Sequence, residues 1–118
     1  MLIMLVENNE NEMRKLQKCV AGCYPNSDII PFTNSSAAME FIKSDRFSVD
    51  LCFTVVAMTG ITGFGLAEEL RKHNKAAKIV FVADSAEYAA EAWQHFASDY
   101  LITPITPESV RHTLASCV

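Results

Sequence analysis

The chain has 118 residues, of which 50% are hydrophobic, and it carries a formal net charge of −4 at pH 7. This composition excludes a disordered segment and fits one domain with a substantial core. The acidic balance excludes the basic stripe of a nucleic-acid surface, and no apolar run reaches the ~20 residues of a membrane span. We therefore expect one cytoplasmic domain over residues 1–118, with no membrane partner.

The first half of the chain alternates between strand and helix patterns. Residues 2–6 (LIMLV) form a continuous apolar run, which predicts a strand buried on both faces. Helical spacing follows over about 10–23, and a weaker strand pattern covers 27–32. Pro31 removes a hydrogen-bond donor from that strand, which favours an edge position. A helix capped by residue 34 or 35 is predicted to run to about 44.

The middle of the chain repeats this alternation. Residues 49–56 (VDLCFTVV) and 78–83 (KIVFVA) read as buried strands, and 64–73 (FGLAEELRKH) reads as the helix between them. In the loop before that helix, Gly63 together with Gly60 is expected to allow a tight turn, and Thr62 can cap the helix.

The last third of the chain contains two predicted helices and a strand. A helix is expected from Ser85 to about Phe96, followed by a short strand over 99–102 (DYLI). Thr106 is placed to cap a final helix whose first residue is Pro107. The whole pattern gives five strands alternating with five helices, which predicts an α/β, doubly wound parallel sheet with right-handed crossovers. Ligands of such sheets sit beyond the carboxyl ends of the strands.

The four cysteines are Cys19, Cys23, Cys52 and Cys117. Their spacing fits neither a zinc site with paired ligands nor the disulfide framework of a secreted domain. A reducing compartment and no cofactor are therefore expected.

The residues at the predicted strand ends carry a resemblance. The stretch VDLCFTVVAMTGITGFGLAEEL resembles the third strand, loop and third helix of response regulator receiver domains, and SDYLITPITPE resembles their fifth strand and last helix. AEYAAEAW followed by ASDYL is similar to receivers that precede LytTR-type DNA-binding domains. The resemblance implies a CheY-like, flavodoxin-like (βα)5 fold with strand order 2-1-3-4-5. It also implies two-component phosphorelay signalling, with any DNA contact made by a C-terminal domain outside this chain.

The same resemblance places the family's phosphate site on five positions of this sequence, and every position departs from the pattern. The acidic Mg²⁺-binding pair falls on Glu7 and Asn8, the phosphoacceptor aspartate on Val55, the hydroxyl residue on Ala83 and the lysine on Thr103. Valine offers no nucleophile for phosphoryl transfer. Glu7, Asn8 and the Ala57 carbonyl would make only a weak magnesium site. We therefore expect a degenerate pseudo-receiver that is not an enzyme, binds no metal and acts through protein contacts.

One alternative remains open at this point, and two others are disfavoured. Asp84 or Glu7 could support residual phosphotransfer or bind a small ligand. Asp50 is expected at the opposite end of the sheet, too far away to contribute. FMN binding is disfavoured because the loop after the first strand is acidic (ENNENE), which repels phosphate.

Other residues have less specific interpretations. The resemblance marks Tyr100 as a switch aromatic and Pro104 as a cis-proline. Trp93 and Phe96 are expected to pack in the core, although they lie beside the fourth helix–fifth strand–fifth helix face that such domains use for homodimers or other protein partners. The three histidines and the run ENNENE, which begins at Glu7, are expected to be solvated.

Overall fold

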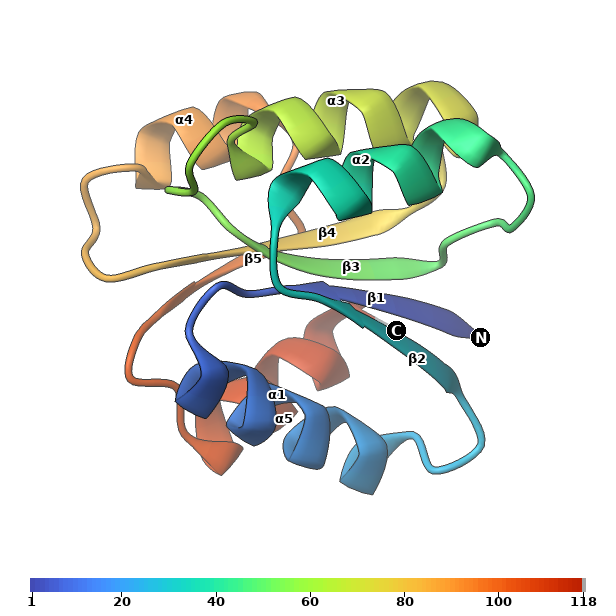
Figure 1. The fold of residues 1–118 in the computed structure, drawn as a ribbon. Helices are drawn as coiled ribbons and strands as arrows, with labels where there is room; N and C mark the ends of the chain where they lie inside the picture. The colour runs from blue at the N-terminus through green and yellow to red at the C-terminus, as the bar shows by residue number, and fades with distance from the viewer. Residues whose placement is uncertain (118) are drawn as a thin grey trace.

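A computed structural model describes residues 1–117. The chain folds into a five-stranded parallel sheet, ordered β2-β1-β3-β4-β5, between two layers of helices (Figure 1). The strands are β1 (Leu2–Val6), β2 (Asp28–Phe32), β3 (Leu51–Val55), β4 (Lys78–Ala83) and β5 (Asp99–Ile102). The helices are α1 (Glu10–Cys23), α2 (Ser35–Ser44), α3 (Gly63–His73), α4 (Ala89–Gln94) and α5 (Pro107–Cys117). The predicted fold class and strand order are confirmed.

Strand alternation divides the core between the two faces of the sheet. On β3, Leu51, Phe53 and Val55 pack with the side chains of α1 and α5. Cys52 and Val56 face the opposite way, toward α2, α3 and α4. The two helical layers in Figure 1 match these two clusters. Because both faces of β3 are covered, all five of its residues are buried.

Short polar side chains cap four of the helices, and three of these caps, at residues 34, 62 and 106, were predicted from the sequence. Each accepts a hydrogen bond from a backbone N–H three residues ahead, and this satisfies one of the unpaired donors of the first turn. The distances from the donor nitrogen to the side-chain oxygen of the cap are 3.0 Å from Glu12 to Asn9, 2.8 Å from Ala37 to Asn34, 3.3 Å from Gly65 to Thr62 and 3.1 Å from Ser109 to Thr106. Asn34 is therefore the cap of α2, which decides between residues 34 and 35.

The edge positions also follow the sequence. β2 is the outermost strand on its side, and Pro31 lies within it and is exposed. Asp50 lies at the amino end of the sheet, where its carboxylate accepts a hydrogen bond from the Leu2 backbone N–H at 2.8 Å.

Within the described residues, no helix is both long enough and apolar enough to cross a membrane.

The predicted helix over 85–96 is wrong at both ends. α4 has only six residues, from Ala89 to Gln94. The Ser85 hydroxyl accepts the Glu87 backbone N–H at 3.3 Å, and the Ser85 carbonyl accepts the Tyr100 hydroxyl at 2.6 Å. These bonds hold residues 85–88 in turns instead of a helix. Beyond the helix, Phe96 takes a left-handed backbone conformation with φ of 57°.

The expected core packing of the α4 aromatics is also wrong. Trp93 is 56% exposed and Phe96 is 77% exposed. A helix of six residues has little inner surface, and Ala92 is its only fully buried residue. One histidine is not solvated as expected, because the His95 ring stacks on Phe64 with a centroid separation of 4.7 Å.

Candidate functional site

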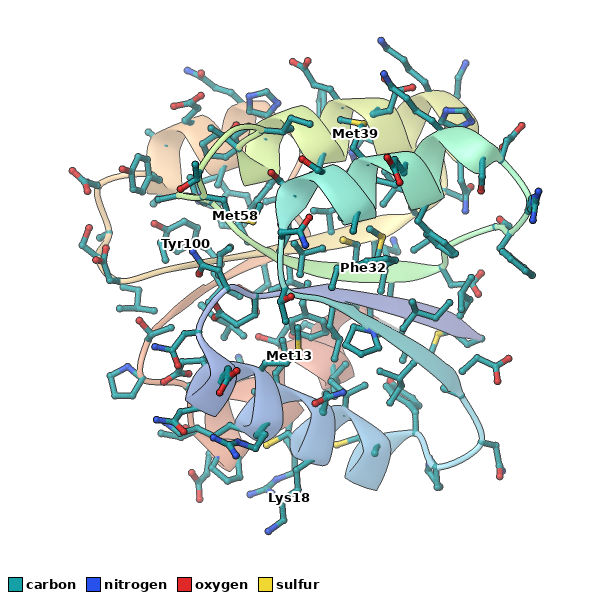
Figure 2. All side chains as sticks on the ribbon, viewed as in Figure 1. Met13, Lys18, Phe32, Met39, Met58 and Tyr100 are labelled. Atoms are coloured by element: carbon teal, nitrogen blue, oxygen red, sulfur yellow. The ribbon has the colours of Figure 1, made fainter. Side chains whose placement is uncertain are left out.

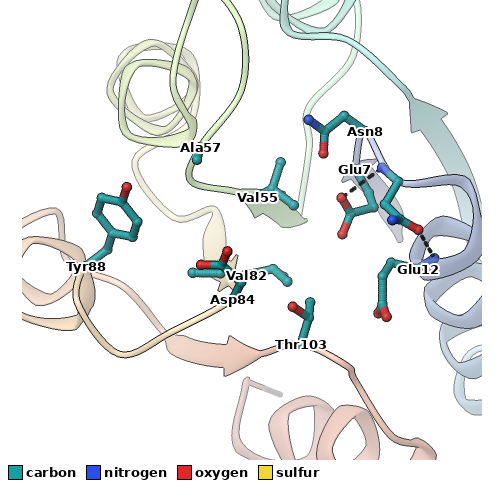
Figure 3. Close-up of a pocket in the computed structure, with 11 residues that line it drawn as sticks. Glu7, Asn8, Glu12, Val55, Ala57, Val82, Asp84, Tyr88 and Thr103 are labelled. Carbon is teal, nitrogen blue, oxygen red and sulfur yellow. Dashed lines mark hydrogen bonds between the residues drawn. The ribbon is translucent and has the colours of Figure 1, made fainter.

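A cleft of about 250 Å³ opens at the carboxyl ends of the strands (Figure 3). Residues from the loops after β1, β3, β4 and β5 line it, together with the first turn of α1. They are Glu7, Asn8, Asn9, Glu12, Val55, Ala57, Val82, Ala83, Asp84, Tyr88 and Thr103. All five positions that the resemblance assigned to a phosphate site thus lie in one cleft, as does the possible metal ligand Ala57.

Local structure fixes the position of Glu7. Its backbone N–H donates to the Phe32 carbonyl at 3.1 Å, which extends the pairing of β1 and β2 by one residue. Its carboxylate accepts a hydrogen bond from the backbone N–H of Asn9, the cap of α1, at 3.2 Å. The chain turns here from strand to helix, and the carboxylate points into the cleft (Figure 3).

The environment of Glu7 raises the pKa of its carboxyl group. The residue is only 4% exposed, and burial is the main cause of the increase. The backbone hydrogen bond from Asn9 lowers the pKa, and the negative charge of Glu12 raises it further. The expectation of a solvated acidic run is therefore wrong at Glu7. No lysine, arginine or histidine is among the residues that line the cleft.

Glu12 lines the same cleft but has partners. One carboxylate oxygen lies 3.0 Å from the Lys15 ammonium group, and the other accepts the Ile105 backbone N–H at 3.3 Å. Glu12 therefore joins the start of α1 to the loop before α5, and its charge is balanced. Sequence reasoning did not assign this role, because Ile105 is 93 residues away in the chain.

Val55 closes the floor of the cleft. It ends β3, is 7% exposed and belongs to the core beneath α1 and α5. The loop that follows requires glycine at two positions. Gly60 has a φ of 86°, and a Cβ added to Gly63 would lie 2.2 Å from the Val55 carbonyl oxygen. A side chain at Gly63 would have to displace backbone, so the predicted tight turn into α3 has a steric cause.

The side of the cleft next to β5 is formed by Thr103. Its backbone N–H donates to the Ala83 carbonyl at 2.8 Å, and its peptide bond to Pro104 is cis. Tyr100, which is labelled in Figure 2, is half-buried and packs against the cluster that includes Ala83. Burial raises the pKa of the Tyr100 hydroxyl, which donates to the Ser85 carbonyl.

The family model of the response regulator receiver domain matches residues 3–115. The chain belongs to the response regulator receiver family. Receiver domains of this kind work in two-component signalling. The chain is 29% identical over 112 residues to the sensory transduction protein LytT of Enterococcus faecalis, an alignment that covers 94% of the chain and 46% of LytT.

Two further comparisons agree with this assignment. Bacillus subtilis LytT is 37% identical over 65 residues, covering 55% of the chain and 27% of LytT. The crystal structure of the response regulatory domain of mrkE from Klebsiella pneumoniae superimposes with a TM-score of 0.86 at 21% identity, covering 99% of this chain and 94% of that one. The chain thus spans less than half of the length of these LytT relatives.

The receiver family implies a magnesium ion in this cleft, but the residues present do not fit one. Magnesium prefers a near-octahedral oxygen shell that includes one or two carboxylates. Among residues 1–117, Glu7 is a buried carboxylate without a cationic partner, and Asn8 beside it offers only an amide. Across residues 1–117, no cluster of three or more His, Cys, Asp or Glu side chains could hold a metal ion.

Sequence reasoning missed four lining residues of the cleft, which are Glu12, described above, and Asn9, Val82 and Tyr88. Asn9 was not distinguished from the other members of the acidic run, Tyr88 was placed on a helix, and Val82 was taken as ordinary core. The parallel register of the sheet could have identified Val82, because it pairs directly with Val55. Tyr88 lines the cleft because residues 85–88 form turns rather than a helix.

Proposed function

We propose that this domain is a pseudo-receiver: a cytoplasmic, non-enzymatic receiver that cannot accept a phosphoryl group and signals through protein contacts. The observation that carries the proposal is Val55 at the end of β3, on the floor of the cleft. Its isopropyl group has no nucleophilic atom, so an in-line phosphoryl transfer has no acceptor there.

The rest of the cleft supports the same proposal. A phosphoryl group carries negative charge and needs cations or N–H donors around it. The cleft instead contains carboxylates, with Thr103 and Ala83 at the positions that the resemblance assigns to a lysine and a hydroxyl residue. Phosphate and FMN would both be repelled by Glu7 and Asp84.

The output surface we propose is the face formed by α4, β5 and α5. Trp93 and Phe96 are exposed on α4 and just beyond it, and Ile102 on β5 is 48% exposed. Strand alternation places Ile102 on the same face of the sheet as Tyr100, toward α4. Exposed apolar groups of this size are characteristic of contact surfaces. Receiver domains generally interact with proteins, and here we propose a homodimer or a protein partner.

Tyr100 is proposed to hold this face in one state. Its hydroxyl is bonded to the Ser85 carbonyl, and its ring packs against the cluster that contains the small Ala83. Without a phosphorylation event to change these contacts, the ring stays inward. The surface is therefore either constitutively presented or controlled by another ligand.

The LytT relatives and the resemblance to LytTR-associated receivers support a further part of the proposal. In the full-length protein, the domain would regulate a C-terminal DNA-binding domain, so that transcription is the process controlled.

Intact-mass measurement after incubation with acetyl phosphate and Mg²⁺ tests the central claim. A receiver with aspartate at the end of its third strand serves as the positive control. The expected result is no phosphoryl adduct on this domain and no Mg²⁺-dependent NMR shift near Glu7. An adduct would overturn the proposal, and mapping it to Asp84 would establish the alternative of residual phosphotransfer.

A second measurement tests the output surface. Light scattering on the domain is expected to show concentration-dependent self-association that is weakened by Trp93→Ala. Phe47→Ala is the matched control, because Phe47 is also exposed (61%) but lies between α2 and β3. Equal effects of the two substitutions would contradict the assignment of the α4–β5–α5 face.

A further inference from the structure

The cleft contains a buried carboxyl group that has no cationic partner among the described residues. Glu7 is 4% exposed, and its carboxylate accepts a backbone hydrogen bond from Asn9 but lies within 4.0 Å of no cationic group in the described residues. Glu12 next to it is paired with Lys15, so Glu7 is the buried carboxylate that lacks a counter-charge. Buried charges in folded proteins are normally paired.

The walls around Glu7 are of two kinds. Amide, hydroxyl and carboxylate groups are available from Asn8, Thr103 and Asp84, and Asp84 is exposed at the rim. The remaining surface includes the apolar side chains of Val55, Val82 and Ala83 and the ring of Tyr88. Figure 3 shows the Glu7 carboxylate directed into the space between these groups.

We propose that the cleft binds an organic cation, an alkylammonium group whose charged end pairs with Glu7 and whose short aliphatic stem contacts the apolar wall. A magnesium ion keeps several waters but is usually held by one or two carboxylates with further oxygen ligands; here Glu12 is already paired with Lys15, and no group of three or more His, Cys, Asp or Glu side chains within residues 1–117 could hold a metal ion. An alkylammonium group needs only a carboxylate and one or two further acceptors, and apolar walls and an aromatic ring suit its methylene groups.

The size of the cleft limits the ligand. A volume of about 250 Å³ lies below the 300–1,000 Å³ that drug-sized ligands usually occupy. A single aliphatic ammonium chain fits this volume, whereas a nucleotide does not. An alkylammonium group can come from a free small amine or from a lysine side chain that a partner protein inserts into the cleft.

This inference rests on the proposed function, because a cleft that accepted a phosphoryl group would not be free to bind an organic cation. It supplies the ligand that could control a receiver without phosphorylation. Binding at Glu7 would act on the start of α1 through Asn9, which caps that helix and donates to the Glu7 carboxylate.

The test is a titration of the ¹⁵N-labelled domain with n-butylammonium chloride at constant ionic strength, followed by amide chemical shifts. Saturable shifts are expected at Glu7, Asn8, Ala57 and Thr103. Neutral n-butanol and sodium butyrate serve as ligand controls and should not reproduce them.

The Glu7→Gln variant keeps the shape of the side chain and removes its charge. Its affinity for n-butylammonium is expected to fall at least tenfold. Asp50→Asn, at the other end of the sheet, is the matched control and should bind as the parent does. Shifts that do not saturate, an unchanged affinity in Glu7→Gln, or tighter binding of Mg²⁺ at the same residues would overturn the proposal.

A lysine-containing peptide and its Nζ-acetylated form distinguish the two sources. Binding of the unmodified peptide alone identifies a partner's lysine side chain as the ligand, and exclusion of both peptides while n-butylammonium binds identifies a free amine. The phosphoryl adduct is measured by mass and cation binding by amide shifts, so a failure of the proposed function and a failure of this inference give different experimental results.

Discussion

Replacing Val55 by aspartate tests whether the cleft can still accommodate a carboxylate at the phosphoacceptor position. Val55→Asn is the matched control, because asparagine has nearly the same shape but no charge. Val55 is 7% exposed, so removing its apolar side chain is expected to cost about 2 kcal/mol in either variant. The aspartate adds a second carboxylate beside Glu7 with no cation in the lining.

That second carboxylate is expected to lower the free energy of unfolding by a further 1–3 kcal/mol, roughly, relative to Val55→Asn at pH 7. Adding Thr103→Lys should recover about 1–2 kcal/mol in the aspartate variant and nothing in the asparagine variant. The difference in the free energy of unfolding between the aspartate and asparagine variants should also become smaller as the pH is lowered from 7 toward 4, because the buried carboxylates become protonated.

Urea unfolding followed by far-UV circular dichroism measures all of these differences. If the aspartate and asparagine variants were equally stable at pH 7, and Thr103→Lys had the same effect on both, then the absence of cations in the cleft would have no energetic consequence. The argument that the cleft lacks the cations needed to stabilise a phosphoryl group would then be refuted.

Three further predictions concern other parts of the fold. Gly63→Ala is expected to destabilise the domain by about 1–3 kcal/mol in urea unfolding, because its Cβ would meet the Val55 carbonyl oxygen at 2.2 Å, and an unchanged midpoint would contradict this. Phe96→Gly is expected to stabilise the domain by about 1 kcal/mol, since Phe96 is exposed and has a φ of 57°; a loss of stability would show that the aromatic ring contributes to folding. The hydrogen bond that the His73 ring donates to the Asp45 carboxylate raises the pKa of His73, so the stabilisation from this pair is fully present below pH 6.5 and is lost as the pH rises through the raised value. His73→Gln should therefore lower the melting temperature more at pH 6 than at pH 8.5, and an equal effect at both would rule out the charged form.

The sequence predicted the sheet because its signals are local. Each strand is a short apolar run, and helices α1, α2, α3 and α5 begin at a short polar residue that caps the first turn. The order of the strands came from the family resemblance, and the structure confirms it.

The region around α4 could not be predicted because its contacts come from distant residues. Residues 85–96 are rich in alanine and glutamate, which favours a helix. The competing bonds involve the Tyr100 hydroxyl on β5 and the Arg71 guanidinium on α3, which donates to the Phe96 carbonyl at 2.6 Å. Neither partner can be inferred from the segment itself, so both ends of the helix and the exposure of Trp93 were misjudged.

The burial of Glu7 was missed for a related reason. The residues that follow it are polar, and the pairing of its backbone with Phe32 of β2 keeps it inside the cleft together with the hydrogen bond from Asn9. A local pattern of alternating acids and amides cannot show that the first of them still belongs to the sheet.

The short α4 also determines where the domain opens first. The helix has six residues, buries only Ala92 and is joined to its surroundings by the hydrogen bonds of Arg71 and Tyr100. Its amide protons should therefore exchange with solvent by local opening, well before those of the central strands β1 and β3, which exchange only when the whole domain unfolds. A ligand or partner that changes the hydrogen-exchange protection of α4 alone would thus change the surface that α4 presents at small energetic cost.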